Sequence, residues 1–385
     1  MKTMHDRGPV PLLTFGFRPF FLLAGVFAFV AMALWAAALG GHGPALGPLW
    51  HGHELLFGYG GAVVAGFILT AASRWTGRTT LTGAPLAALV LLWAAGRLVA
   101  ALPGVPGGLA AAVTAGFFVV LGIGVARPIV AARSRRNYGI LAVLAAFAGL
   151  ELLYWLVPGE RSRTLLSALL FMLVLVAVIG GRILPLFTRN ATPGLVVRPG
   201  RQVRDVVALA ALAGLAVMVL CPDDPRWLAG TLACAGALAH AARLKGWGGS
   251  TTFGRPLLAV LHAAYACIPA GLALFAARAF GAALPPWVAL HVLALGGFGL
   301  MTLGMMTRVT LGHTGRPLRA DPGTTVAYVL LVVALIVRAV SPFLGAVPAY
   351  HALLASAGLW SAAFLLFVLV YAPRLVRPRV DGRPG

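Results

Sequence analysis

Residues 19–39 read PFFLLAGVFAFVAMALWAAAL and contain no charged side chain. About 20 predominantly apolar residues are enough for an α-helix to cross the hydrocarbon core of a bilayer. The strands of a transmembrane β-barrel are about 10 residues long and alternate between apolar and polar side chains. Because this stretch is longer and apolar throughout, it predicts a transmembrane helix.

The composition of the whole chain leads to the same conclusion. The chain has 385 residues, of which 60% are hydrophobic and 10% are charged, and its mean hydropathy is +0.94. Soluble proteins are about 25% charged, so this chain lacks the polar side chains that cover a soluble domain. A cytosolic enzyme, a nucleic-acid-binding module and a disordered protein are therefore excluded. We expect an all-α, polytopic membrane protein in contact with the lipid bilayer, because helices satisfy their own backbone hydrogen bonds.

About twelve apolar stretches of this kind are separated by connections rich in proline and glycine, which favour turns. The predicted transmembrane helices are residues 19–39, 50–72, 84–102, 108–131, 138–157, 164–187, 203–220, 226–244, 256–280, 286–309, 324–345 and 348–371.

The net charge of +21 comes from basic residues that lie mainly in alternate connections. Connections on one side of the membrane contain little beyond Arg161, Arg163 and Arg226. Arginine and lysine accumulate in cytoplasmic loops, so the richer side, to which both termini belong, is predicted to be the cytoplasm. No nucleic-acid partner is needed to explain the charge. The richer side carries Arg74, Arg78, Arg127, Arg133, Arg135, Arg136, Arg189, Arg198, Arg201, Arg204, Arg243, Lys245, Arg316, Arg319, Arg374, Arg377, Arg379 and Arg383.

Two offsets align separate parts of the sequence. An offset of 238 residues (291 − 53) superimposes His53 on His291 and aligns the TGR tripeptides that follow both histidines. A weaker offset of 115 residues (181 − 66) aligns Gly66 with Gly181. Together they predict three units of four helices within a single membrane domain, and chance similarity between apolar helices is the alternative. The candidate units are residues 1–132, 133–247 and 248–385.

A group of ionisable residues, WHGHE at 50–54, lies at the outer end of the second predicted helix. Each ionisable group within a span costs about 3 kcal/mol on insertion scales, so three in four residues need an explanation. Imidazole is a common ligand of haem iron and copper. His51 and His53 point to roughly opposite sides of a helix, whereas His51 and Glu54 share one face. We predict a metal site here, and an interfacial cluster solvated by lipid headgroups is the alternative.

His291 lies at a similar depth on the tenth predicted helix, because both helices run from the outer to the inner face. Two histidines that face each other from separate helices suit axial ligation of a haem, so His53 and His291 are the predicted axial ligands. Glycine-rich runs follow both, and these leave room for a planar macrocycle or simply allow close helix packing. Arg97 and Arg338 are predicted to bind the haem propionates, with snorkelling to the interface as the alternative.

His262 and His313 are further candidates for copper. His262 is a lone histidine on the apolar ninth helix, where an ordinary interhelical hydrogen bond is the competing role. His313 lies at the cytoplasmic end of the tenth helix, where a loop contact is the alternative. The methionines Met301, Met305 and Met306 are soft copper ligands by type, although core packing is the favoured explanation for them.

Several segments resemble the NnrS family, and the resemblance covers nearly the whole chain. NnrS proteins are bacterial inner-membrane proteins that contain haem and copper and are associated with denitrification and with resistance to nitric oxide and nitrosative stress. The resemblance therefore implies haem, copper, and nitric oxide or an iron-nitrosyl species as the molecules that this chain meets. The segments are GFRPFFLL (16–23), WHGHELLFG (50–58), GGRILPLFTRN (180–190), RPLLAVLHAAY (255–265) and MMTRVTLGHTGRPL (305–318).

The resemblance also implies a set of ligands, and it leaves open which of them bind haem and which bind copper. His51, together with Glu54, is expected at the copper site. The three cysteines lack the CxxCH spacing of a covalently attached haem, so a b-type haem is expected. Redox activity on nitric oxide or its metal adducts, sensing and scavenging all stay open. The family's histidine positions fall on His51, His53, His262, His291 and His313.

The predicted arrangement is also similar to the catalytic subunit of the haem–copper oxidases, a family that includes nitric oxide reductases. Both place a haem between the second and tenth of twelve helices, near the outer face. Those enzymes use histidines of their sixth and seventh helices for copper or non-haem iron. The corresponding stretches here, 164–187 and 203–220, contain no histidine, so a binuclear centre of that kind is not expected.

Two other classes of function compete with a haem- and copper-binding protein of nitric oxide metabolism. Repeated units and intramembrane charge also suit a transporter of copper, haem or a small anion. The histidines, however, gather near one face rather than at the midplane. An assembly partner of a nitric-oxide-related complex, without chemistry of its own, is the other alternative.

Overall fold

The computed structural model describes residues 10–43, 46–197, 202–221 and 225–383, and all regular structure in these ranges is helical. Within these ranges, ten helical segments are long and apolar enough to cross a membrane. The predicted all-α, polytopic membrane fold is confirmed.

The described helices fall into three consecutive groups. The first contains α1 Phe17–Leu39, α2 Pro48–His53, α3 Gly61–Thr76, α4 Gly83–Ala101 and α5 Gly107–Ala131. The second contains α6 Tyr138–Leu156, α7 Arg161–Ala191, α8 Gln202–Met218 and α9 Arg226–Lys245. The third contains α10 Pro256–Ala279, α11 Pro286–His291, α12 Met301–His313, α13 Pro322–Val340 and α14 Ala346–Val376. Short 3₁₀ turns lie at Pro11–Leu13, Arg135–Asn137, Pro158–Glu160, Gly249–Thr252 and Ser341–Phe343.

Two of the twelve predicted spans coincide with helices that are less suited to cross a membrane. In the part of the chain that the structure describes, α8 has 17 residues, and α9 carries Arg226, Arg243 and Lys245, which lower its hydropathy. Both helices still pack lengthwise in the bundle, α8 between α7 and α9, and α9 against α10. The twelve expected helices are therefore present, and ten of them are candidate spans.

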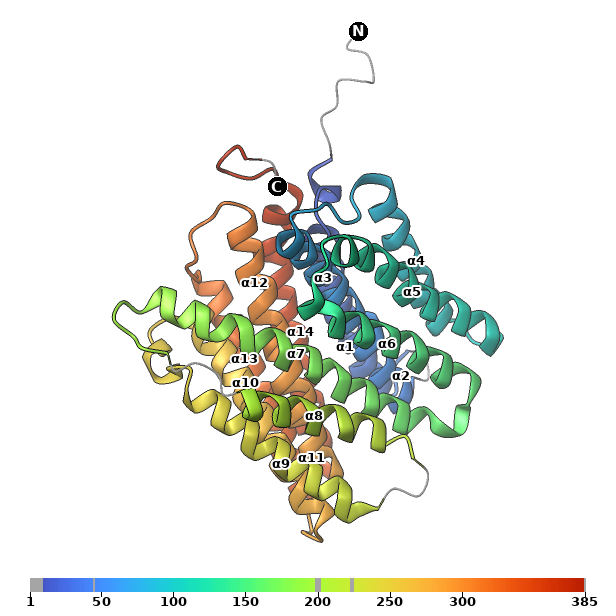
Figure 1. Ribbon diagram of the computed structural model, residues 1–385. Coiled ribbons are helices and arrows are strands. Elements are labelled where there is room, and N and C mark those ends of the chain that lie inside the picture. Colours follow the sequence, from blue (N-terminus) through green and yellow to red (C-terminus); the bar gives the residue numbers. More distant parts are fainter. Residues whose placement is uncertain (1–9, 44–45, 198–201, 222–224, 384–385) are drawn as a thin grey trace.

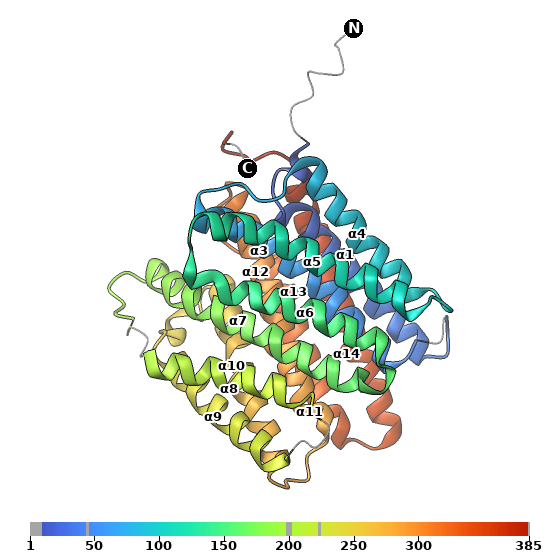
Figure 2. The same cartoon turned by 45° about the vertical axis from the view of Figure 1, so that its right-hand side comes forward.

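The chain closes on itself, because the first and last helices lie side by side. α1 packs against α14, and α14 packs against α13 (Figure 1). Arg18 at the start of α1 donates hydrogen bonds of 2.7 Å to the carbonyls of Leu375 and Arg377 at the end of α14. Figure 2 shows α5, α6 and α7 in succession across another face. We call the end of the bundle that carries α2 and α11, away from these contacts, the distal end.

Three segments form the centre of the bundle. Within the most apolar window, 83% of the residues are buried in both Pro48–Thr76 and Pro286–His313, and 67% in Pro158–Ala191, against 22–56% in the other seven spans. Each central segment is the second long helix of one candidate unit. The more exposed helices thus lie around these three segments. The division at residues 132 and 247 stays a prediction.

Two of the central segments share an unusual local structure. α2 ends at His53 and continues as the π-helix η2, Glu54–Gly60, and α11 ends at His291 and continues as the π-helix η6, Val292–Leu300. The offset of 238 residues maps the first residue of η2 onto the first of η6 (292 − 54). π-Helical turns are rare in proteins, and those that do occur are often found at functional sites. His53 and His291 therefore occupy equivalent junctions between α- and π-helix.

Gly25 tests the contact that closes the bundle. A Cβ atom on Gly25 of α1 would lie 2.6 Å from the ring of Phe367 on α14, which stacks on Tyr371 and has little freedom to move. Overpacking costs about 1–3 kcal/mol, so Gly25→Ala should lower the thermal midpoint of the detergent-purified protein. Gly122→Ala is the matched control, because a Cβ atom there meets nothing within 4 Å, and it should leave the midpoint unchanged or raise it. Equal midpoints for the two variants would contradict this packing.

Candidate metal and charge centre at the distal end

His53 lies between two carboxylates. Its Nδ1 is 2.7 Å from Oε1 of Glu54, and its Nε2 is 3.0 Å from Oε2 of Glu151. All three side chains are at most 1% exposed. Glu54 follows His53 directly on η2, whereas Glu151 comes from α6. Both ring nitrogens of His53 therefore already have partners.

Arg97 extends this contact network from α4. Its Nη1 donates a 2.7 Å hydrogen bond to Oε1 of Glu54. The close approach of Arg97 to Glu54 depends on Gly58, because a Cβ atom at residue 58 would lie 2.7 Å from Nη1 of Arg97. One turn earlier on α4, Trp93 donates from Nε1 to the carbonyl of Gly58 at 2.9 Å. Basic and acidic groups thus alternate along Arg97, Glu54, His53 and Glu151, which we call the distal charge chain.

Aromatic rings enclose the distal charge chain. The ring centroid of Tyr154 lies 4.4 Å from that of His53, and those of Phe57 and Trp155 lie 5.2 and 5.4 Å away. Arg161 covers Tyr154 from the outside, 5.2 Å from its ring centroid. Because these groups displace water, the charges interact in a low dielectric, where pairing is strong and an unpaired charge is costly.

His51 points to the other side of α2, as helical geometry predicts. Its ring stacks on Trp35 of α1, with centroids 5.0 Å apart and an interplanar angle of 17°. Its Nδ1 is buried and has no hydrogen-bond partner among the described residues. A buried polar atom without a partner is costly, so this nitrogen is available to a ligand.

Arg338 interacts electrostatically with both His51 and His291, and the two histidines interact more weakly with each other. Nδ1 of His291 is 2.8 Å from the carbonyl oxygen of Trp287, which can only accept, so Nδ1 carries the proton and Nε2 keeps the lone pair. Arg338 donates to Ser341 at 3.0 Å, and its Nε is buried without a partner in the described part of the chain. We call His51 and His291 the distal histidine pair.

The other predicted histidine ligands lie elsewhere. Nε2 of His262 is 2.8 Å from the hydroxyl of Thr188 on α7, and its Nδ1 is buried without a partner in the described ranges. His313 lies at the opposite end of the bundle, 5.5 Å between ring centroids from Phe17. The structure therefore distributes the five histidines among three places. Within the described residues, no three His, Cys, Asp or Glu side chains gather so as to hold a metal ion.

Sequence reasoning missed two features of the buried polar structure. It did not identify Glu151 as the partner of His53, although a carboxylate on an apolar helix signals a buried contact. It also missed a second network near the other end of the bundle. There Nδ1 of His240 lies 2.8 Å from the hydroxyl of Tyr265, which accepts a 2.7 Å hydrogen bond from Arg243.

Removing Arg97 should destabilise the fold strongly. Breaking a buried ion pair costs about 3–5 kcal/mol, because the remaining charge stays buried, and Arg97→Ala leaves Glu54 with one cationic partner fewer. Arg163→Ala is the matched control, since Arg163 pairs with Glu160 at 40% and 31% exposure and an exposed pair contributes about 0–1 kcal/mol. Thermal unfolding in detergent measures both, and a similar loss in the two variants would contradict the role of the distal charge chain.

Comparison with known proteins identifies the family of this chain. A search of curated proteins finds no match. The profile of the family described as NnrS protein matches residues 11–379, which includes every helix described above. The match confirms the resemblance predicted from the sequence segments. The chain belongs to the NnrS family of membrane proteins, which is linked to the response to nitric oxide.

Proposed function

We propose that this chain is a haem- and copper-binding protein of the bacterial inner membrane that acts in nitric oxide metabolism or in resistance to nitrosative stress. Its family supports the connection with nitric oxide. The observation that carries the metal part of the proposal is the distal histidine pair. In the part of the chain that the structure describes, Nδ1 of His51 and Nε2 of His291 have no hydrogen-bond partner, and both residues lie on central segments.

The donor set fits a metal centre. Metal-binding histidines commonly donate their second ring N–H to a carbonyl or carboxylate, which fixes the tautomer. His291 has this arrangement with Trp287. His53, by contrast, must exchange a carboxylate contact before it can bind a metal. We therefore propose His51 and His291 as the first pair of ligands. The further candidates are His53, Glu54, His262 and His313.

The surrounding residues supply charge and shape to such a centre. A haem or copper ion, when bound, supplies a redox-active metal with affinity for nitric oxide. Arg338 has a buried Nε without a partner among the described residues, which suits a propionate or another anion. Arg97 already donates to Glu54, so we place it beside the centre rather than on a propionate. His53 and Glu151 are close enough to share a proton between Nε2 and Oε2.

The orientation is also part of the proposal. The end of the bundle at which α1 begins and α14 ends carries most of the basic residues, and such residues accumulate in the cytoplasm. Both termini are therefore assigned to the cytoplasm. The distal histidine pair then lies near the outer face of the membrane.

Cofactor content tests the proposal. We expect detergent-purified protein to contain haem and copper near stoichiometry, and to change its reduced-minus-oxidised spectrum when nitric oxide is added. His51→Ala and His291→Ala should each remove the same cofactor, the one that the distal histidine pair holds, because each variant deletes one of its ligands. His351→Ala is the matched control, since His351 is exposed at the start of α14, and it should keep both. Metal analysis and absorption spectra measure the outcome.

Three results would decide against this function or these ligands. Full haem and copper in both variants would show that other residues bind them. Loss of a cofactor in His53→Ala, but not in His51→Ala or His291→Ala, would show that His53 of the distal charge chain is the ligand. A metal-free wild-type protein, purified without stripping, would favour the transporter or the assembly partner.

A further inference from the structure

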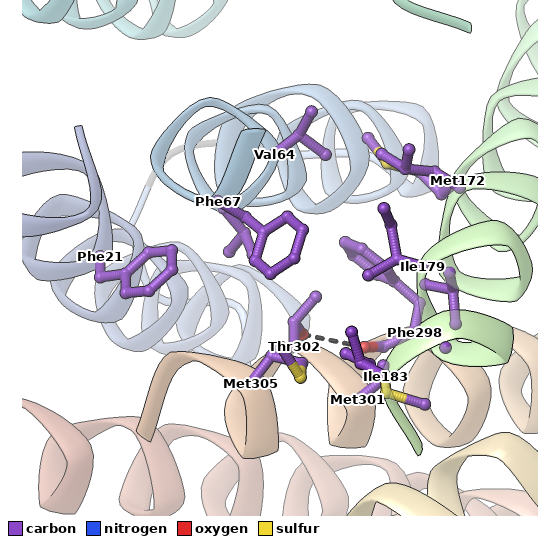
Figure 3. Close-up of a pocket in the computed structure, with 14 residues that line it drawn as sticks. Phe21, Val64, Phe67, Met172, Ile179, Ile183, Phe298, Met301, Thr302 and Met305 are labelled. Carbon is purple, nitrogen blue, oxygen red and sulfur yellow. Dashed lines mark hydrogen bonds between the residues drawn. The ribbon is translucent and has the colours of Figure 1, made fainter. Parts of the chain in front are cut away.

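A cavity of about 60 Å³ lies where the three central segments meet. Fourteen residues line it, and they come from α1, α3, α7, η6 and α12 (Figure 3). Val64 and Phe67 face it from α3, Met172 and Ile179 from α7, and Met305 from α12. The cavity contains no histidine in its lining and is therefore separate from the candidate metal centre.

The lining offers a ligand almost nothing polar. Thr302 is the one lining residue with a hydroxyl, and that hydroxyl is already used. It donates to the carbonyl of Phe298 at 2.8 Å and lies 2.6 Å from the hydroxyl of Tyr59. A water molecule in a buried cavity needs two to four polar partners. It occupies only about 10–15 Å³, so this cavity is large enough for water, but apolar cavities of such size stay dry. The space therefore suits a small apolar molecule rather than water or an ion.

The position of the cavity follows from the predicted repeats. The offsets of 115 and 238 residues map Val64 onto Ile179 (64 + 115) and onto Thr302 (64 + 238), and all three line the cavity. These equivalent side chains are β-branched and short. Short side chains do not fill the space between three helices that meet at one point, so a cavity is left there.

One side of the cavity is not fully closed. Phe67 of α3 and Val176 and Ile183 of α7 line it and are partly exposed, whereas Val64, Ile179 and Thr302 are buried. These partly exposed residues lie within candidate membrane spans. A neutral molecule dissolved in hydrocarbon can enter there without crossing a polar layer.

The cavity is also close to the candidate metal centre along the helices. Val63 follows His53 by ten residues (63 − 53), and Met301 follows His291 by ten (301 − 291). The cavity therefore lies ten residues further along each of these two central segments than His53 and His291.

We propose that this cavity binds a neutral diatomic gas, nitric oxide or oxygen, taken up from the bilayer. Such molecules are small, apolar and uncharged, as the lining requires. The choice of nitric oxide over oxygen rests on the proposed function, whereas binding of an apolar gas rests on the cavity alone.

Xenon is the probe for the site. Crystals of the wild-type protein under xenon pressure should show an anomalous peak between Val64, Ile179 and Thr302. Val64→Phe should abolish the peak, because the larger ring fills the space. Val329→Phe is the matched control, since Val329 is 55% exposed on α13, and it should retain the peak. If Val64→Phe does not fold, Ile179→Ala serves instead, because a larger cavity should hold more xenon.

Competition then identifies the natural class of ligand. Magnetic resonance of ¹²⁹Xe measures whether a second gas displaces xenon from the protein in solution. Displacement by both nitric oxide and oxygen supports a general gas site. Displacement by nitric oxide alone supports the nitric oxide assignment. No xenon in the wild type, an unchanged peak in folded Val64→Phe, or no displacement by either gas would overturn the proposal. A metal-free protein that still binds xenon would overturn the proposed function and leave this site intact.

Discussion

A carboxylate within a membrane must find a cationic partner, and this constraint organises the distal end of the molecule. Glu54 and Glu151 meet His53 and Arg97, which connects the central segment 48–76 to α4 and α6. Replacing one partner leaves a charge in a low dielectric, so the four groups depend on one another. The same contacts occupy both nitrogens of His53. His51, on the opposite side of α2, takes no part in these contacts, and its buried Nδ1 has no hydrogen-bond partner among the described residues.

The distal histidine pair and the central cavity lie on the same buried segments. η2 and η6 begin directly after His53 and His291, and α3 and α12 continue from them to the cavity. One set of helices thus carries a candidate metal centre at the distal end of the bundle and an apolar space further along the same helices. The arrangement suits a reactant that is itself apolar and reaches a metal from the bilayer.

Much of the fold could be predicted because its signals are local. Hydropathy located the helices, and the spacing of His51 and His53 placed them correctly on opposite sides of α2. The contacts of the site could not be predicted in the same way. The pairing of His53 with Glu151 and the stacking of His51 on Trp35 join helices that are distant in sequence. No local pattern distinguished η2 and η6 from ordinary helix beyond their glycines, so the two π-helices were also missed.

The most direct test of the account is the number of histidine nitrogens bound to the metal. Pulsed electron paramagnetic resonance of the oxidised protein, prepared with natural-abundance and with ¹⁵N-labelled histidine, measures this coupling. We predict imidazole coupling in the wild type that changes with the label and is lost or reduced in His291→Ala. A paramagnetic metal signal without histidine coupling, or one that His291→Ala and His51→Ala leave unchanged, would contradict the assignment of the distal histidine pair.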